Sequence, residues 1–229
     1  MPPKKKANPL GRAKKPIPES ETIFFYMPND KPYGVFCQWH PSTITIPITS
    51  LHFLTSSTAS ADSTTDSATI LEEHAPSLTF GCAEQFYMFA KALYFADSST
   101  CTRILATSDP KEQKKLGQQV RNFNDFKWSL VKSRVARVGN WYKFTNPANR
   151  YMCDILLGTG EQELAEASRR DRIWGIGYNA EEAERFRKMW GENLLGKALM
   201  GVRERLREKM EKNEEEGWEW DGTLEGGEE

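Results

Sequence analysis

Strand-like segments come first along this chain, and helical periodicity follows. Residues 22–27 (TIFFYM) and 42–48 (STITIPI) are rich in β-branched and aromatic residues, which predicts two strands. From Phe80 onward, apolar residues recur at helical spacing. The pattern therefore predicts a small β portion near the N-terminus and a mainly helical body.

The helical part carries start signals as well as apolar stripes. Ser108 or Asp109 is the predicted cap of a helix with Pro110 in its first turn, and Asp125 is the predicted cap of the next helix. Asn146, followed by Pro147, opens a third predicted helix that stops at Gly158, and Asn193 opens the last one. The predicted apolar stripes are Leu116, Val120 and Phe123; Trp128, Val131, Val135 and Val138; and Leu195, Leu199, Val202 and Leu206. We therefore expect an α+β fold, mainly α, in a single domain over residues 21–211.

Three segments have compositions that favour disorder. Residues 1–20 are basic and rich in proline, which is typical of a nuclear-localisation or polyanion-binding arm and equally of a solubilising tail. Residues 55–69 contain only Ser, Thr, Ala and Asp, so they cannot bury enough surface to offset the entropy of ordering them. Residues 212–229 are acidic, which also favours disorder. We expect a disordered tail at each end and a disordered insertion within the domain.

The overall composition argues against several classes of protein. The chain of 229 residues is 38% hydrophobic and 28% charged, with a formal net charge of −1, so no strong field points to nucleic acid or membrane. No apolar run is long enough to cross a bilayer. The four cysteines form no C-x-x-C pair and the three histidines form no helical pair. We therefore expect an intracellular protein with reduced thiols, no metal site and no membrane partner.

Residues 82–95 (CAEQFYMFAKALYF) form a helix that is apolar nearly all round, which predicts burial. Glu84 and Lys91 lie seven residues apart and share one face. Buried charges are costly, so the pair has two readings. Glu84 could simply favour the helix N-terminus while Lys91 extends to water. Alternatively, the two residues line a pocket in which desolvation frees a neutral, nucleophilic amine.

The segment 166–178 (EASRRDRIWGIGY) begins a match to the dinucleotide motif G-x-G-x-x-A at Gly175. That motif binds phosphate only between a buried strand and a helix, and the charged residues RRDRIW are no central strand. Two interpretations are left for Asp171 and Trp174. Asp171 pairs with a surface arginine and Trp174 belongs to the core, or both residues are part of a functional site.

Several blocks, in order along the chain, resemble one family. They are FGCAEQFYMFAKALYFAD, KKLGQQVRNF, Trp128 with Arg134 six residues later, LLGTGEQELAEASRRDRIWGIG and WGENLLGKALMGVRERL. Together they resemble the YbiA-like or NADAR family over roughly residues 23–210. The loop GVFCQWHP is similar to the family's LSNF or LSQW segment, whereas GQQV lacks the arginine of the family's GRxV.

The resemblance implies an N-glycosidase that acts on a ribosylated substrate. One branch of the family acts on phosphorylated pyrimidine intermediates of riboflavin synthesis, and another removes ADP-ribose from guanine bases. The implied mechanism uses a lysine Schiff base with the opened ribose. The helix 82–95 supplies Lys91 for that role, and Glu84 and Asp171 are the candidate proton carriers.

The substrate-binding candidates follow from the same resemblance. Trp128, Trp174 and Trp39 could stack on the base, and Arg134 could hold a phosphate. Each has an alternative as a core tryptophan or a surface arginine. No cofactor is implied, and the expected partner is a small molecule or an ADP-ribosylated nucleobase. Nucleic acid is a further candidate partner, through the substrate or the basic arm, in the cytoplasm or nucleus. A module that only binds ADP-ribose or NAD is the alternative function.

Overall fold

The computed structural model describes residues 22–55 and 66–211. In chain order the elements are β1 (Thr22–Phe25), η1 (Tyr33–Phe36), β2 (Ile44–Pro47), η2 (Ile48–Leu54), α1 (Ser67–Glu72), β3 (Ser77–Phe80), α2 (Ala83–Tyr94), α3 (Ser98–Leu105), α4 (Pro110–Gln118), α5 (Asp125–Ser129), α6 (Lys132–Thr145), η3 (Pro147–Asn149), α7 (Arg150–Gly158), β4 (Glu163–Glu166), α8 (Ala180–Ala183), η4 (Glu184–Met189) and α9 (Leu194–Glu211). The predicted α+β, mainly α architecture is confirmed, and both predicted strands are present as β1 and β2.

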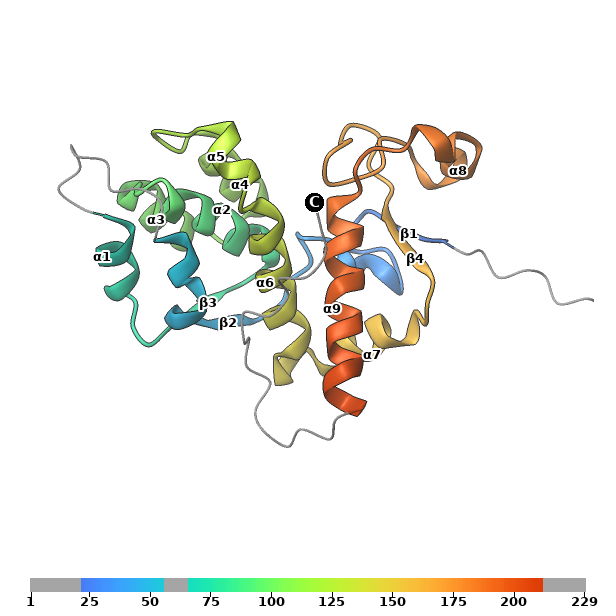
Figure 1. Ribbon diagram of the computed structural model, residues 1–229, viewed down its shortest axis with the longest axis horizontal. Coiled ribbons are helices and arrows are strands. Elements are labelled where there is room, and N and C mark those ends of the chain that lie inside the picture. The colour runs from blue at the N-terminus through green and yellow to red at the C-terminus, as the bar shows by residue number, and fades with distance from the viewer. Residues whose placement is uncertain (1–21, 56–65, 212–229) are drawn as a thin grey trace, which may run out of the picture.

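Helices α6 and α9 run side by side through the middle of the molecule (Figure 1). Helices α1 to α5 and the strands β2 and β3 lie on one side of this pair, and α7, α8, β1 and β4 lie on the other (Figure 1). Helix α2 packs against α3, α4 and α6, and most of its residues are buried. The prediction that residues 82–95 form a buried helix is therefore confirmed.

The strands pair in two ways. Strand β2 pairs antiparallel with β3, with Ile44 opposite Phe80. Strand β1 pairs parallel with β4, with Thr22 opposite Glu163 and Phe25 opposite Glu166. The β1–β4 pair joins the first described strand to one that lies more than a hundred residues later. This long-range closure places the end of β4 beside the loop that follows β1.

Several predicted boundaries differ from the structure. The stripe from Trp128 to Val138 belongs to two helices, α5 and α6, and the cap of α5 is Asn124 rather than Asp125. The break lets Trp128 turn toward Tyr94 and Phe95, while Val138 faces the core. Helix α4 starts at the predicted Asp109 cap and ends before Val120.

The disorder predictions fall mostly outside the described residues. This holds for the arm 1–20, for residues 56–65 of the insertion and for the tail 212–229. The C-terminal end of the insertion differs from the prediction, because Ser67–Thr69 form the first turn of α1. The Asp66 side chain caps that turn by accepting from the Thr69 N–H at 2.8 Å, and the buried Ser67 hydroxyl donates to the Leu93 carbonyl.

Candidate active site

A cavity of about 440 Å³ opens where the first half of α2 faces the end of β4. This volume falls in the range of about 300–1,000 Å³ that is usual for small-molecule sites. Its walls come from the loops after β1 and η1, from α2, α4 and α9, and from the loop after β4. The lining residues are Tyr26, Met27, Pro28, Cys37, Gln38, Trp39, Glu84, Tyr87, Met88, Lys114, Glu166, Ser168, Arg170, Asp171, Trp174 and Leu195.

Glu84 lies in the first turn of α2 and is 8% exposed. Its backbone N–H donates to the Gln38 carbonyl at 3.0 Å, which ties the helix start to the aromatic loop. Burial raises the pKa of its carboxyl to about 7, and the Lys114 charge and a hydrogen bond from the Trp39 side chain act in the opposite direction. Its Oε1 atom is buried without a hydrogen-bond partner among the described residues. Such an orphaned oxygen in a cavity wall is suited to a ligand or to a transferable proton.

Glu166 is the last residue of β4, and its carboxyl has the same properties. Burial raises its pKa to about 7, assisted by the negative charges of Asp171 and Glu84 and opposed by Lys114. Its Oε2 atom is also buried and has no partner among the described residues. The two carboxyls thus line one cavity, and burial is the main cause that raises the pKa of each.

Asp171 lines the cavity but also organises its own loop. Its Oδ1 atom accepts from the N–H groups of Ile173 at 2.9 Å and Trp174 at 2.8 Å. This is an Asx-type turn, in which the carboxylate holds the backbone that carries Trp174. Asp171 therefore has a structural role as well as an electrostatic one.

The Gly-Ile-Gly segment explains how this loop fits behind the cavity. A Cβ atom on Gly175 would lie 2.8 Å from the Glu166 carbonyl oxygen and 3.0 Å from the Ser168 side chain. Gly177 has a φ of +80°, which glycine adopts readily. The Ile176 N–H donates to the Glu166 carbonyl at 2.9 Å. The glycines therefore let the chain return against the end of β4.

The three predicted tryptophans have different places. Trp39 and Trp174 line the cavity, and the Trp174 ring meets Tyr87 edge-on at 5.1 Å between centroids. Trp128 is 5% exposed and does not line the cavity. Its indole N–H donates to the Tyr87 hydroxyl at 3.0 Å, so it supports the cavity wall from behind.

Two predicted cations lie away from the cavity. The Lys91 ammonium donates to the Gly117 carbonyl at 2.9 Å and sits 3.9 Å from the centroid of the Phe123 ring. Burial lowers the Lys91 pKa, but its amine contacts α4 rather than Glu84. The Arg134 guanidinium lies over the Phe53 ring at 4.3 Å. Neither residue lines the cavity, so the geometry does not support their predicted roles.

Lys114 and Arg170 are the cations that line the cavity. The arginines of segment 169–172 therefore differ in their surroundings: Arg170 lines the cavity, whereas the Arg172 guanidinium donates to the Met189 carbonyl at 2.6 Å. Sequence reasoning missed Lys114, Tyr87 and Glu166. Lys114 lies on the exposed face of α4, so its sequence pattern is that of a solvated surface lysine.

A further lysine lies just behind the cavity wall. Lys143 is fully buried, and its ammonium donates to the Cys37 carbonyl at 3.0 Å. Burial lowers its pKa to about 8. Burial also raises the pKa of the Cys37 thiol to about 11, which makes this cavity-lining cysteine a poor nucleophile.

Two other geometric findings bear on the class of site. Within residues 22–55 and 66–211, no group of three or more His, Cys, Asp or Glu side chains could hold a metal ion. In the same part of the chain, no helix is long and apolar enough to cross a membrane.

Comparison with known proteins identifies the fold and the family. Residues 24–207 match the NADAR domain family. This chain belongs to the NADAR family. The resemblance seen in the sequence blocks is therefore confirmed.

Named relatives and a solved structure agree with this assignment. N-glycosidase R617 of Acanthamoeba polyphaga mimivirus is 42% identical over 124 residues, which are 53% of this chain and 72% of the relative. N-glycosidase Npun_R5314 of Nostoc punctiforme is 31% identical over 134 residues, which are 58% of this chain and 79% of the relative. The solution structure of Escherichia coli YbiA superposes with a TM-score of 0.57 at 23% identity, covering 86% of this chain and 90% of YbiA. YbiA thus shares the fold of this NADAR chain.

Proposed function

We propose that this NADAR protein is an N-glycosidase that hydrolyses the bond between C1 of a ribosyl group and the nitrogen of a nucleobase-like amine. The ribosyl group carries a phosphate or belongs to ADP-ribose. Two relatives that bear the name N-glycosidase support the reaction class. The observation that carries the proposal is the pair Glu84 and Glu166, which face one cavity with buried, unpartnered carboxylate oxygens.

The carboxylate pair suits the proton transfers of this reaction. Both groups have a pKa of about 7, so near neutral pH each can serve as an acid or as a base. The base takes a proton from the attacking nucleophile, and the acid delivers one to the departing nitrogen. Glu166 therefore takes the role that the sequence suggested for Asp171. The Asp171 charge keeps the Glu166 pKa high.

The cations account for a phosphorylated sugar. Arg170 and Lys114 line the same cavity as the carboxylates, and a phosphate between them would receive charge-assisted hydrogen bonds. Trp39 and Trp174 offer flat faces on which a base can stack. Lys114 and Arg170 take the role that the sequence suggested for Arg134, and of the three predicted tryptophans Trp39 and Trp174 keep theirs.

Lys114 is the amine best placed to form a Schiff base. It lines the same cavity as Glu84 and Glu166, and its positive charge lowers the pKa of both acids. A carboxyl first protonates the ring oxygen of the sugar as the C1–O4 bond breaks, which leaves C1 joined to the base nitrogen as an iminium. Neutral Lys114, its proton passed to a carboxylate, then adds through Nζ to C1, and the C1–N bond breaks as the base leaves with a proton. Water then adds to C1 of the iminium, and the C1–Nζ bond breaks to return free lysine and the ribosyl product.

Borohydride trapping identifies the lysine. We expect reduction during turnover to leave a sugar adduct on Lys114, mapped by peptide mass spectrometry, and none in Lys114→Ala or Lys114→Arg. An adduct on Lys91 would restore the role that the resemblance gave it. Turnover without any adduct would mean that a carboxylate base activates water directly.

A module that only binds ADP-ribose or NAD is not favoured. Binding alone gives no reason to bury the carboxyls of two glutamates in the walls of one cavity, since each burial costs stability at neutral pH. Such costs are typical of residues that are kept for chemistry.

The substrate is either a free phosphorylated intermediate or a modified base in a polymer, and nucleic acid is a partner only in the second case. We place the reaction in the cytoplasm or nucleus, because all four cysteines are free and buried, as is usual in reducing compartments.

One assay tests the proposal. The full chain is incubated separately with a phosphoribosylated pyrimidine amine and with ADP-ribosylated guanine in single-stranded DNA, and released ribose phosphate or ADP-ribose is measured by mass spectrometry. We expect release from one substrate by the wild type and by Glu163→Gln, a matched control on β4 outside the cavity. We expect release to be lower by about 10²–10⁴-fold in Glu84→Gln and in Glu166→Gln. Binding of ADP-ribose without release from either substrate would contradict the proposal.

A further inference from the structure

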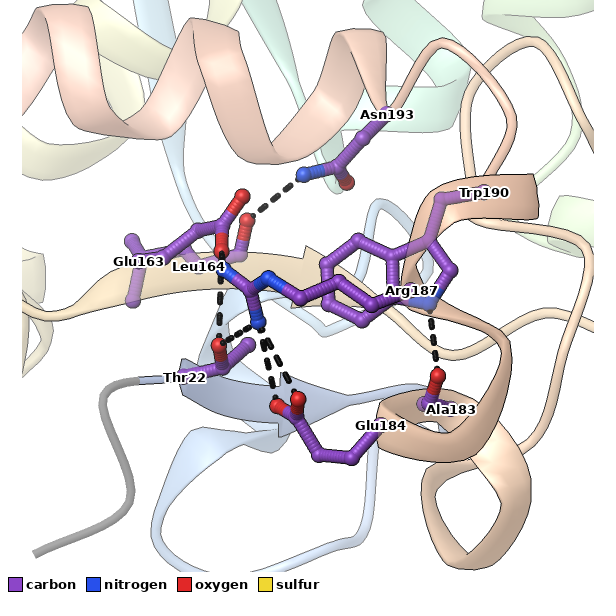
Figure 2. A network of polar contacts seen from close by, with 8 residues as sticks. All are labelled: Thr22, Glu163, Leu164, Ala183, Glu184, Arg187, Trp190 and Asn193. Atoms are coloured by element: carbon purple, nitrogen blue, oxygen red, sulfur yellow. Dashed lines mark hydrogen bonds and ion pairs between the residues drawn. The ribbon is translucent and has the colours of Figure 1, made fainter.

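Asn193 connects the start of α9 directly to the strand that carries Glu166. It is 5% exposed and has a φ of +52°. Its Nδ2 group donates to the Leu164 carbonyl at 2.8 Å, as Figure 2 shows. Its Oδ1 atom accepts from the Glu166 N–H at 3.2 Å. One side chain thus holds two backbone groups of β4.

These two bonds imitate a neighbouring strand. The Leu164 carbonyl and the Glu166 N–H flank Ala165 and point to the same edge of β4, while β1 occupies the other edge. The carboxamide of Asn193 presents one donor and one acceptor, as a backbone peptide group does. The last residue of β4 is therefore fixed from both sides, although β4 has only one partner strand among the described residues.

The residues after Asn193 extend the same contact to the loop after β4, which carries Trp174. The N–H groups of Leu194 and Leu195 donate to the carbonyls of Ile173 and Trp174, at 3.0 Å and 3.1 Å. A Cβ atom on Gly196 would lie 2.0 Å from the Leu164 carbonyl oxygen, so only glycine permits this approach of helix to strand. The segment 193–196 therefore holds the backbone of both Glu166 and Trp174.

We propose that Asn193 is a positioning residue for Glu166, which it aims into the cavity without touching the substrate. The inference rests on the proposed N-glycosidase function for its kinetic consequences. Its structural part stands on the two hydrogen bonds and on the burial of Asn193. In the sequence block GENLLG, Asn193 thus binds the backbone of β4, and Gly196 allows α9 to approach the strand closely.

The test compares a variant at this end of β4 with a control at the other end. Asn193→Gly removes both side-chain bonds but accepts the positive φ. Arg187→Gln is the control, because Arg187 binds Glu163, Thr22 and Glu184 around the first residue of β4 (Figure 2), and none of these residues lines the cavity. Asn193→Asp keeps an acceptor for the Glu166 N–H and tolerates the same φ.

We expect Asn193→Gly to lower kcat on the order of 100-fold with KM within about twofold, which is the usual effect of a reacting group misplaced by about 1 Å. Asn193→Asp should recover part of that rate, and Arg187→Gln should stay within about twofold of the wild type. A loss of stability in Asn193→Gly with unchanged kcat would overturn the proposal and make Asn193 a structural residue only.

A measurement made without substrate distinguishes the positioning role of Asn193 from the proposed N-glycosidase activity. Carbon-13 NMR follows the titration of the Glu166 carboxyl, whose charged neighbours are Asp171, Lys114 and Glu84. We expect the Glu166 pKa to fall toward its ordinary value in Asn193→Gly, because water reaches the loosened carboxyl. The same shift in a protein that hydrolyses no substrate would retain the positioning role and refute the N-glycosidase. An unshifted titration together with normal turnover would refute the positioning role alone.

Discussion

The two walls of the cavity reach the same electrostatic result by different structural means. The first wall is the start of α2, where Glu84 belongs to a helix packed on three sides by α3, α4 and α6. The second wall is the end of β4 and the loop after it, where backbone hydrogen bonds to Asn193, Asp171 and the Gly175 turn hold Glu166 and Trp174. Each wall presents one glutamate with a pKa of about 7. Apolar packing fixes the first wall, and a set of polar contacts fixes the second.

The largest expected effect comes from replacing either glutamate by glutamine, which cannot transfer a proton. Glu84→Gln and Glu166→Gln should each lower kcat by about 10²–10⁴-fold, because a positioned acid or base contributes that much. Glu163→Gln should stay within about twofold of the wild type. Steady-state kinetics on the substrate found in the release assay measures all three. A wild-type rate in either cavity variant would show that only one of the two walls supplies a proton-transfer group.

The tryptophans distinguish support of a wall from contact with a ligand. Trp128→Ala should lower the free energy of unfolding by about 3–5 kcal/mol, because it empties a buried site behind Tyr87. Trp174→Ala should weaken ligand binding by about 1–3 kcal/mol through lost stacking. Urea unfolding and calorimetric titration with ADP-ribose or ribose phosphate measure the two effects. Unchanged affinity combined with a large loss of stability in Trp174→Ala would make it a core residue as well.

Burial of Glu84 should make folding stability depend on pH. The folded-state pKa is about 7 and the ordinary value is 4.5, so between these pH values the folded protein keeps a proton that the unfolded chain has lost. The free energy of unfolding contributed by this group therefore falls as pH rises from about 4.5 to about 7. Glu84→Gln should be more stable than the wild type at pH 8 by on the order of 1–3 kcal/mol, from about 1.4 kcal/mol per pKa unit.

Urea unfolding at pH 4 and pH 8 measures this difference. The advantage of Glu84→Gln should be much smaller at pH 4, where both states of the wild type are protonated. Equal stability of the two proteins at both pH values would show that Glu84 is ionised without cost and is not the proton carrier we describe.

The same contrast between the walls explains what could be predicted from the sequence. Glu84 was identifiable because it interrupts a helix that is apolar by its own pattern, so its burial could be read locally. Glu166 ends the strand ELAE, which has no β-branched residue and forms a strand because it pairs with β1. Its burial arises from contacts far apart in the chain, and no local pattern contains that information.

The lysines and tryptophans illustrate a second limit. Lys91 shares a helical face with Glu84, yet its side chain turns to Gly117 and Phe123 on the neighbouring segment. Trp128 and Trp174 look alike as isolated aromatics, and only their tertiary placement separates wall support from cavity lining. Helix periodicity fixes a direction from the axis, whereas the packing of α2 against α4 decides which residues meet the cavity.

The pH dependence of kcat/KM is the measurement that bears most directly on Glu84 and Glu166 as the acid and the base of the reaction. We expect a bell-shaped profile centred near pH 7, because both groups have a pKa of about 7. Asp171→Asn, which keeps the turn but removes a charge that raises the Glu166 pKa, should move one limb to lower pH. The Asp171 charge is not among the causes that shift Glu84, so the other limb should stay in place. A profile that is flat between pH 5 and pH 9 would show that Glu84 and Glu166 do not carry the protons of the reaction.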